Sequence, residues 1–434
     1  MIWKSVRYRG TVATVMTEEF RTKRSLPRLL ELLESPTDDK DKKLGGRLPI
    51  RALSFEPPRN FPRDFDSEQW MAEEFTTLVE ILDTFSEHHN RHDDTDNRLK
   101  ILFIEGDAAE LPMDVARNLI NSVVNIDSLQ VLRLNSLYFS DAGWLGTLSD
   151  IPRLDNIQTL QIMHGSVRLP ELLNFAPNVE SLLAWTHDRA FWTLKDEILS
   201  RLPQLTKLSL DAVHHPSMLQ NLAEAIEKIH HDQNSTIPLE ELFLEGHQPN
   251  NQRSRLIQAL GKTAPNLKRL SLYHVKNPKS AFAHEIADHL PHLESLALVA
   301  GDCSAPTLWS DELEYYLEAL ARFQQLTFFA WDRLPPRFIS DQTISVAQIN
   351  YDCFKQMGLS LTNIREIVNI VQDVSEGSTG WFATFKPVEA SSTSTSATNK
   401  VQLTVRHETR KDFLVGLDHF VVLRDKQRNN LSIV

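Results

Sequence analysis

A run of histidines and acidic residues holds the side chains most able to do chemistry in this sequence. Residues 87–94 contain three histidines and three acidic residues. Neutral imidazoles and carboxylates are common metal ligands. The segment shows no helical face, however, and no second cluster completes a tetrahedral site. Because short histidine tracts are only a compositional signal, we interpret this run as a solvated loop, as we do His214–His215 and His230–Asp232, and we expect no metal and no cofactor.

Motifs for catalysis are absent from the sequence. It contains no Gly-x-Ser-x-Gly elbow, no phosphate-binding Walker loop, no Gly-x-Gly-x-x-Gly and no His-Glu-x-x-His. The glycines of residues 377–380 mark a turn. Cys303 and Cys353 lie in no nucleophile motif, and two cysteines cannot make a disulfide framework. The sequence therefore predicts a protein that is not an enzyme, and it disfavours a hydrolase or metal-dependent enzyme.

A repeated pattern, Leu-x-x-Leu-x-Leu, dominates the chain instead. Its clear copies start between 22 and 34 residues apart, and self-similarity at such a period is typical of leucine-rich repeats and other solenoids. A weaker copy starts at Leu326 and an earlier one at Ile50, and the long step from Ile50 to Leu99 implies an insertion or an unseen repeat. The clear copies start at Leu99, Leu129, Ile157, Val179, Leu205, Leu239, Leu267 and Leu293.

The spacing within the pattern predicts a strand, and the residues between copies predict helices. The fourth and sixth positions lie on one side of a strand. Helical spacing of apolar residues follows, as in Phe282, Ile286 and Leu290. Prolines, which helices cannot continue through, precede the next strand. No such unit buries its apolar stripe alone, so the units must stack. These prolines are Pro177, Pro203, Pro265 and Pro291.

On these residues the chain resembles a leucine-rich repeat protein. The resemblance implies an α/β solenoid, with a curved parallel sheet inside and helices outside. The ninth position of each copy, usually Asn or Cys in that family, varies here, so no continuous asparagine ladder is expected. The degenerate copies resemble those of fungal F-box proteins with leucine-rich repeats.

A second resemblance lies at the start of the chain. Residues 2–8, Ile-Trp-Lys-Ser-Val-Arg-Tyr, are similar to the strand that follows the F-box in fungal F-box proteins. An ordinary edge strand also fits this segment. If the resemblance holds, the F-box itself is missing, because the strand begins almost at Met1. Either the gene model starts at an internal methionine or the lineage has lost its F-box.

Three regions follow from these patterns. Residues 1–45 are expected to form an N-terminal capping segment with a strand and a helix. Residues 46–335 form the solenoid. Residues 336–434 form a C-terminal cap, in which residues 364–374 are expected to be helical and residues 381–385, 401–406 and 420–423 to be strands. Residues 390–399 are Ser/Thr-rich, offer almost nothing to bury and are predicted to be a disordered loop.

The third, fifth and seventh positions of each strand should face the concave side of the solenoid. Aromatic and apolar residues gather there among charged ones, and Trp, Tyr and Arg are enriched at binding hot spots. We therefore expect an exposed partner-binding patch, unless a loop or the C-terminal tail covers it. Its predicted residues are Met163, Leu183, Trp185, Lys207, Asp211, Glu241, Phe243, Glu245, Arg269 and Tyr273.

Net charge, hydropathy and cysteine content limit the kinds of partner and compartment that are expected for this protein. The formal net charge is −12, and no dense basic block is present, so nucleic-acid binding is not expected. No apolar run is long enough for a transmembrane helix, and no secretory signal is visible. The cysteine count suits a reducing compartment, so we expect the cytoplasm or nucleus.

These observations predict non-enzymatic protein recognition. The resemblance implies the substrate-recognition part of an F-box-type ubiquitin-ligase receptor, which would contact the ligase adaptor if an F-box lies upstream. The alternative is a free-standing leucine-rich repeat scaffold or regulator that does not dock on a ligase. The sequence does not identify the partner.

Overall fold

The computed structural model describes somewhat more than half of the chain, in stretches that follow the repeats. The described residues are 5–9, 52–56, 67–89, 99–106, 110–135, 137–139, 153–163, 173, 176–185, 200–211, 218–233, 235–245, 250–273, 275, 279–299, 311–332, 346–374, 377–387 and 401–410. The chain divides into two compact units, with the boundary between Ile198 and Leu199.

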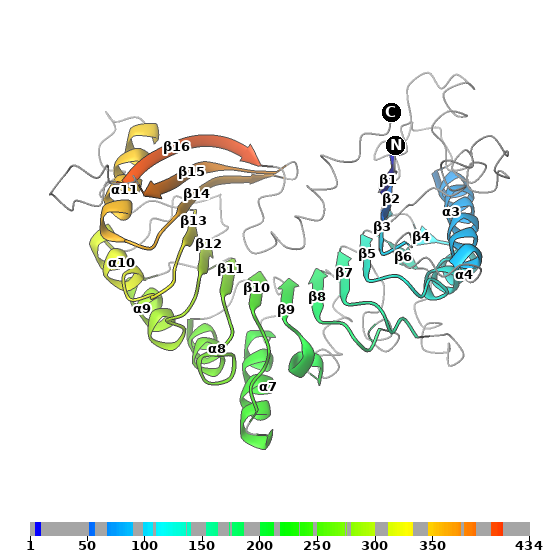
Figure 1. Cartoon of the computed structure of the whole chain (residues 1–434), viewed down its shortest axis with the longest axis horizontal. Coiled ribbons are helices and arrows are strands. Elements are labelled where there is room, and N and C mark those ends of the chain that lie inside the picture. The colour runs from blue at the N-terminus through cyan, green and yellow to red at the C-terminus, as the bar shows by residue number, and fades with distance from the viewer. Residues whose placement is uncertain are drawn as a thin grey trace, which may run out of the picture. The chain divides into compact units, whose positions relative to one another are not determined.

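Unit 1 contains a parallel sheet of short strands (Figure 1). Helices α3 (Ser67–His89) and α4 (Met113–Val124) contact each other beside it. A small second sheet pairs β4 (Glu110–Leu111) with β6 (Tyr138–Phe139). The strands of the main sheet, in spatial order, are β1 (Ser5–Arg9), β2 (Ala52–Glu56), β3 (Ile101–Glu105), β5 (Val131–Asn135), β7 (Thr159–Met163) and β8 (Ser181–Trp185).

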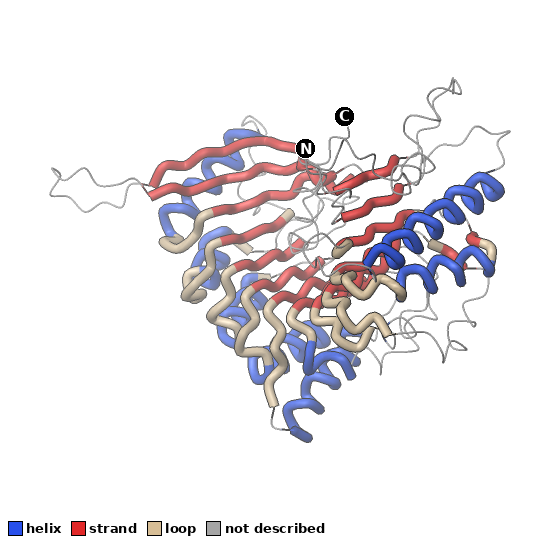
Figure 2. Tube along the Cα trace, turned by 45° about the vertical axis from the view of Figure 1, so that its right-hand side comes forward, coloured by secondary structure: helices blue, strands red, loops and turns tan. Residues whose placement is uncertain are grey.

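Unit 2 continues the same plan and ends in two antiparallel strands (Figure 2). Its parallel strands are β9 (Lys207–Asp211), β10 (Glu241–Glu245), β11 (Arg269–Tyr273), β12 (Ser295–Val299), β13 (Phe328–Trp331) and β14 (Glu366–Val374), followed by the antiparallel β15 (Gly377–Pro387) and β16 (Val401–Arg410). A 3-10 turn η5 (Leu202–Gln204) precedes β9, and the helices are α7 (Met218–Gln233), α8 (Asn250–Thr263), α9 (Ser280–His289), α10 (Leu313–Leu320) and α11 (Val346–Ser360).

In both units, residues at the same position of successive repeats are neighbours across the sheet. In unit 2 the fourth positions Leu208, Leu242 and Leu270 are register partners, and the sixth positions align in the same way. All these side chains are buried. In unit 1 the sixth-position Phe55 packs its ring 4.9 Å from that of Phe75 on α3, so these positions face the helical layer. The predicted α/β solenoid fold is confirmed.

Several strands are entered through a tight turn. The first-position amide donates to the carbonyl three residues earlier, as from Leu267 to Ala264 and from Leu293 to Leu290. Pro265 and Pro291 thus occupy the second residue of a β-turn, where a φ fixed near −65° is favoured. The predicted prolines therefore end the helix and also shape the turn into the next strand.

A backbone hydrogen-bond pattern recurs between neighbouring repeats. The second-position carbonyl accepts from the second- and third-position amides of the next repeat. Glu240 O, for example, accepts from Lys268 N at 2.8 Å and Arg269 N at 3.0 Å. The same pair of bonds links Lys100 to the β5 repeat and Thr327 to the β14 repeat. Since these donors and acceptors belong to the backbone, the repeats keep their register even where their side chains are degenerate.

Asparagine does link repeats, although not at the ninth position. The residue just before the first position carries the contact. Asn178 donates through Nδ2 to Asp155 O at 2.8 Å, and Asn363 donates to Gln324 O at 2.9 Å. Asn156 makes the equivalent bond to Asp127 O, and Ser128 Oγ donates to Leu99 O at 2.7 Å. The short polar side chain thus links the start of one repeat to a backbone carbonyl at the start of the preceding repeat.

Two predictions about the ends of the repeat array are settled by the pairing. β2 pairs directly with β3, so the 50–99 step holds an insertion, which includes α3, and no unseen repeat. β1 pairs with β2 in parallel, with Val6 opposite Leu53 and Tyr8 opposite Phe55. The strand predicted at the start of the chain is therefore confirmed, and it extends the repeat sheet.

The C-terminal prediction was partly wrong. Residues 364–374 are not a helix, because Glu366–Val374 is β14, which pairs with β13 in repeat register. The strands predicted at 381–385 and 401–406 are confirmed within β15 and β16. At the sixth position β14 carries Asn369, whose buried amide donates to Asn350 Oδ1 on α11 at 2.8 Å. The predictions for residues 26–33, 390–399 and 420–423 lie outside the described residues.

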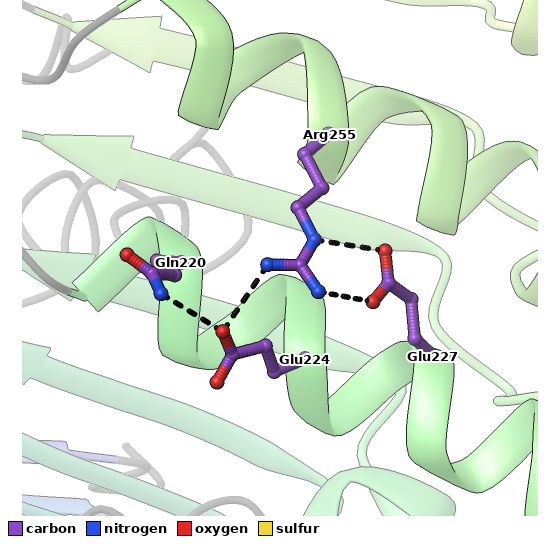
Figure 3. A network of polar contacts seen from close by, with 4 residues as sticks. All are labelled: Gln220, Glu224, Glu227 and Arg255. Atoms are coloured by element: carbon purple, nitrogen blue, oxygen red, sulfur yellow. Dashed lines mark hydrogen bonds and ion pairs between the residues drawn. The ribbon is translucent and has the colours of Figure 1, made fainter.

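Ion pairs join the outer helices of unit 2. Arg255 on α8 makes a two-pronged contact with Glu227 on α7, at 3.0 and 2.6 Å, and reaches Glu224 at 3.1 Å (Figure 3). The hydrogen bonds that Arg255 donates to Glu227 are the main cause that raises the pKa of Arg255. Arg253, two residues earlier and on another side of α8, is buried with its guanidinium carbon 5.4 Å from the centroid of the Phe282 ring, and desolvation lowers its pKa to about 10. Guanidinium groups therefore link α8 to both neighbouring helices.

No helix within the described ranges is long and apolar enough to cross a membrane.

The cap offers a sharp test of packing at Gly358 on α11. A Cβ there would lie 2.1 Å from Cε1 of the buried Phe385 on β15. Alanine usually stabilises a helix interior relative to glycine, but overpacking costs about 1–3 kcal/mol. We expect Gly358→Ala to lower the free energy of unfolding by about that amount, measured by urea denaturation. The neighbouring Leu359 is 72% exposed, so Leu359→Ala should change stability by less than about 0.5 kcal/mol. An increase in stability for Gly358→Ala would contradict the packing.

Candidate partner-binding face

The inner face is the side of each sheet that carries the third, fifth and seventh strand positions. It lies opposite the face that the helices cover, because the fourth and sixth positions pack on the helices. The predicted binding residues all occupy inner-face positions by register. They fall into two groups, one in each unit, and each group is described by itself.

In unit 1 the predicted residues lie on β7 and β8. Met163 is half-buried and lies opposite Trp185 in register, and Leu183 at the fifth position is 2% exposed. The side chain of Trp185 lies outside the described residues. The predicted exposure of Leu183 is therefore wrong, while Met163 can still be reached from the inner side.

In unit 2 three charged side chains lie next to each other across the sheet. Lys207, Glu241 and Arg269 are register partners at the third position of β9, β10 and β11. Lys207 Nζ lies 3.2 Å from Glu241 Oε1. Glu241 is buried, whereas Lys207 and Arg269 are half-buried. The sequence predicted these charges at this face but treated them all as exposed, and burial of Glu241 corrects that point.

An aromatic pair lies beside this charged row. Phe243 and Tyr273 have ring centroids 4.9 Å apart at an interplanar angle of 42°. They are 1% and 6% exposed, so the exposed aromatic patch predicted from the sequence is not present at these residues. Strands lie only about 4.8 Å apart, so a fifth-position side chain is crowded by neighbours on its own strand and on both adjacent strands. The pair forms a packed base, and the charged side chains lie around it.

The seventh positions give this part of the face an acidic end. Glu245 is half-buried and lies opposite Asp211 on one side and Tyr273 on the other. The Asp211 side chain is outside the described residues. The inner face of unit 2 therefore carries charges of both signs at the third positions of β9 to β11 and a carboxylate at the seventh position of β10.

Sequence reasoning missed the polar residues of the inner face in unit 1. The buried Arg133 lies with its guanidinium carbon 5.8 Å from the ring centroid of Phe103, and Asn135 donates to Glu105 Oε1 at 3.2 Å. Gln161 is buried between Arg133 and Leu183 in register. The repeat pattern placed all of them at this face, but composition alone did not show that they would be buried.

The described residues contain no group of three or more His, Cys, Asp or Glu side chains placed to hold a metal ion. Residues 90–94 of the histidine-rich run lie outside those residues, while His88 and His89 end α3. The loop predicted there is therefore wrong for residues 87–89, and it is also wrong for His230–Asp232, which lie in α7. Cys353 is a buried free thiol. What the described inner face offers is hydrogen bonding, charge and packing.

Similarity to known proteins is found among solved structures. No protein-family model matches the chain, and no curated protein matches it. The chain is similar to a chain in the crystal structure of the Rad7 and Elc1 complex in yeast, with 16% sequence identity and a TM-score of 0.45. The match covers 74% of this chain and 70% of that chain. At that TM-score the likeness carries no argument about function.

The repeats and their pairing therefore define the class of this protein. It is a repeat protein with an α/β solenoid fold, with a parallel sheet in each unit and, opposite the helices, an inner face built from repeated strand positions.

The ion pair on the inner face can be tested by its effect on stability. Lys207→Met would leave the buried Glu241 carboxylate without the ammonium 3.2 Å away. Because an uncompensated buried charge destabilises a fold, we expect a loss of about 1–3 kcal/mol in urea denaturation. The double variant Lys207→Met with Glu241→Leu should recover most of that loss. Additive losses in the double-mutant cycle would show that the two side chains are not coupled.

Proposed function

We propose that this protein is a non-enzymatic recognition module that binds another protein through its inner face. One observation carries the proposal. In unit 2, the half-buried Lys207 and Arg269 lie beside the packed pair Phe243 and Tyr273. Apolar groups surrounded by charged ones are the usual anatomy of a protein interface. Repeat proteins typically use such extended faces for binding.

The proposed binding residues fall into two groups, because some are accessible to a partner and others are buried. The accessible side chains, Met163, Lys207, Glu245 and Arg269, would touch the partner directly. Leu183, Glu241, Phe243 and Tyr273 would support them from beneath, because a rigid base lowers the entropy lost on binding. Trp185 and Asp211 complete the proposed set by their register positions.

We propose further that the bound protein is a substrate of a ubiquitin ligase and that this chain is the receptor that presents it. The support is the resemblance to fungal F-box proteins, which rests on residues 2–8 and on the degenerate repeats. β1 (Ser5–Arg9) pairs as the first strand of the repeat sheet, which is the place that the resemblance gives it. The contact with the ligase adaptor would come from an F-box upstream of that strand.

Direct contact at the charged row can be tested by charge reversal. Arg269→Glu should weaken partner recovery at least roughly tenfold, because charge reversal at an interface costs more than the loss of a neutral contact. The measurement is quantitative mass spectrometry after affinity purification from the cells that express the protein. Lys228→Glu, an equal charge change at an exposed site on α7, is the control and should leave recovery unchanged. Equal recovery by wild type and Arg269→Glu would contradict the assignment of this face.

The same purification separates the two kinds of recognition protein. A ligase receptor should recover the ligase adaptor when the native full-length product is used, and its partner should accumulate when the protein is depleted. Stoichiometric recovery of a stable partner without the adaptor would contradict the ligase role and favour a free-standing scaffold.

A further inference from the structure

The smallest side chains of the inner face in unit 2 are buried more completely than their own sheet can explain. Ala297 and Ala330 are the fifth-position residues of β12 and β13, and both are 0% exposed. Ser271, opposite Ala297 on β11, is 1% exposed. Neighbouring strands shield a residue from the sides, but they do not shield a methyl group that stands among other small side chains from above. A further layer must therefore cover this part of the face.

The neighbouring side chains of the inner face do not form that layer. Ser295 and Val299 are the inner-face neighbours of Ala297 on its own strand, and both are short. The longer Arg269 and Phe328 lie at diagonal positions on β11 and β13 and are themselves half-buried. Val299, at the seventh position, is 3% exposed. Burial thus extends across the whole patch, as it does beneath a second layer of chain.

The described helices of unit 2 do not form the layer either. Their side of the sheet carries the sixth positions, such as Asn369, which bonds to Asn350 on α11. Parallel sheets are usually covered on both faces. The cover over Ala297 therefore comes from residues outside the described ranges, in this chain or in a second copy of it.

One stretch of unit 2 has a composition suited to this cover. Unit 2 extends as far as Asp425, and eight of the eleven residues 413–423 are Phe, Leu or Val. Such a segment is stabilised when it leaves water for an apolar surface. Residues 300–310 and 333–345, which follow β12 and β13, instead place prolines and polar residues between their apolar side chains.

The position of β16 lets this segment reach the patch. Arg410, the last residue of β16, pairs with Ser378, at the end of the sheet where β14 finishes with Val374. The chain thus leaves β16 where the repeat strands have their carboxyl ends. β12 lies four strands from β16, which is about 19 Å at the usual strand spacing. About six extended residues span that distance, so residues 413–423 can lie over Ala297.

We propose that residues 413–423 pack on the inner face of unit 2 and cover the patch formed by Ser271, Ala297 and Ala330. The segment is then an internal competitor, because a partner that binds at Arg269 and extends over β12 must displace it. The competition rests on the proposed recognition function, whereas the packing does not. Apparent affinity for the partner falls by the fraction of molecules in which the face is open.

The packing can be tested by the reactivity of an introduced thiol in the full-length chain. The parent carries Cys303→Ser, and its remaining native thiol, Cys353, is buried. Ala297→Cys is added to it and labelled with a maleimide reagent, which should react slowly. Phe420→Asp with Val421→Asp should raise the labelling rate at least about tenfold, because a carboxylate on either side of an extended segment is costly to bury.

Two controls accompany the measurement. Ala287→Cys places a thiol on α9, where Ala287 is 3% exposed on the helical side of the sheet. It should stay protected in every variant that remains folded. Phe338→Asp with Ile339→Asp adds the same charges to the loop after β13 and should leave Ala297→Cys protected.

Rapid labelling of Ala297→Cys in the parent, or equal labelling with and without the aspartates at 420 and 421, would overturn the proposal. Exposure by the loop substitutions would overturn it as well, and so would protection that disappears on dilution, which would identify a second copy as the cover. If the aspartates also expose Ala287→Cys, the milder pair Phe420→Ser and Val421→Ser is judged by the same criteria.

Competition with the partner has a separate readout. Partner recovery by affinity purification should rise at least about threefold for Phe420→Asp with Val421→Asp. Unchanged recovery together with an exposed thiol would contradict the competition and leave the packing in place. Recovery that is also unchanged by Arg269→Glu would count against the proposed function instead, since the thiol measurement involves no partner.

Discussion

Stacking of identical strand positions is the constraint on which the rest of this structure depends. A five-residue strand cannot bury its two leucines alone, so each must find the equivalent leucines of the neighbouring repeats. The carbonyl at the second position sets the register, because it accepts two amides from the next repeat. Once that register is fixed, every other residue of the strand is assigned to a face. The helices, the turns and the inner face all follow from it.

The same constraint explains the character of the inner face. Since strand spacing is fixed, a side chain at the fifth position is surrounded by its equivalents, and large ones such as Phe243 become buried. Charged side chains at the third position can extend past this base, as Lys207 does toward Glu241. The face therefore combines a rigid apolar interior with adjustable charges. Polar side chains at the fifth position, such as Arg133, Gln161 and Ser209, are buried in the same way, and the amide nitrogen of Gln161 has no hydrogen-bond partner.

The sequence predicted the repeats, the prolines between them and the residues of the inner face, because these depend on short-range spacing. It missed the repeat that contains β14. Ile364, Ile367 and Val368 fit helical spacing, and Asn369 breaks the Leu-x-Leu signature at the sixth position. The turn at Leu361–Ile364 and the β-branched residues were the signals that favoured a strand. Burial at the inner face was not predictable from the pattern, because it depends on the sizes of side chains on three adjacent strands.

The change of strand direction at β15 has a consequence for assembly. An array of parallel repeats can be extended indefinitely, because each added strand exposes the same kind of hydrogen-bonding edge as the strand before it. β14, β15 and β16 are also 9, 11 and 10 residues long, about twice the length of the repeat strands. Another copy of the chain that approached this end with a short parallel strand would meet a longer antiparallel edge with a different hydrogen-bond spacing. Such an edge is a poor template for end-to-end growth of the array into a filament.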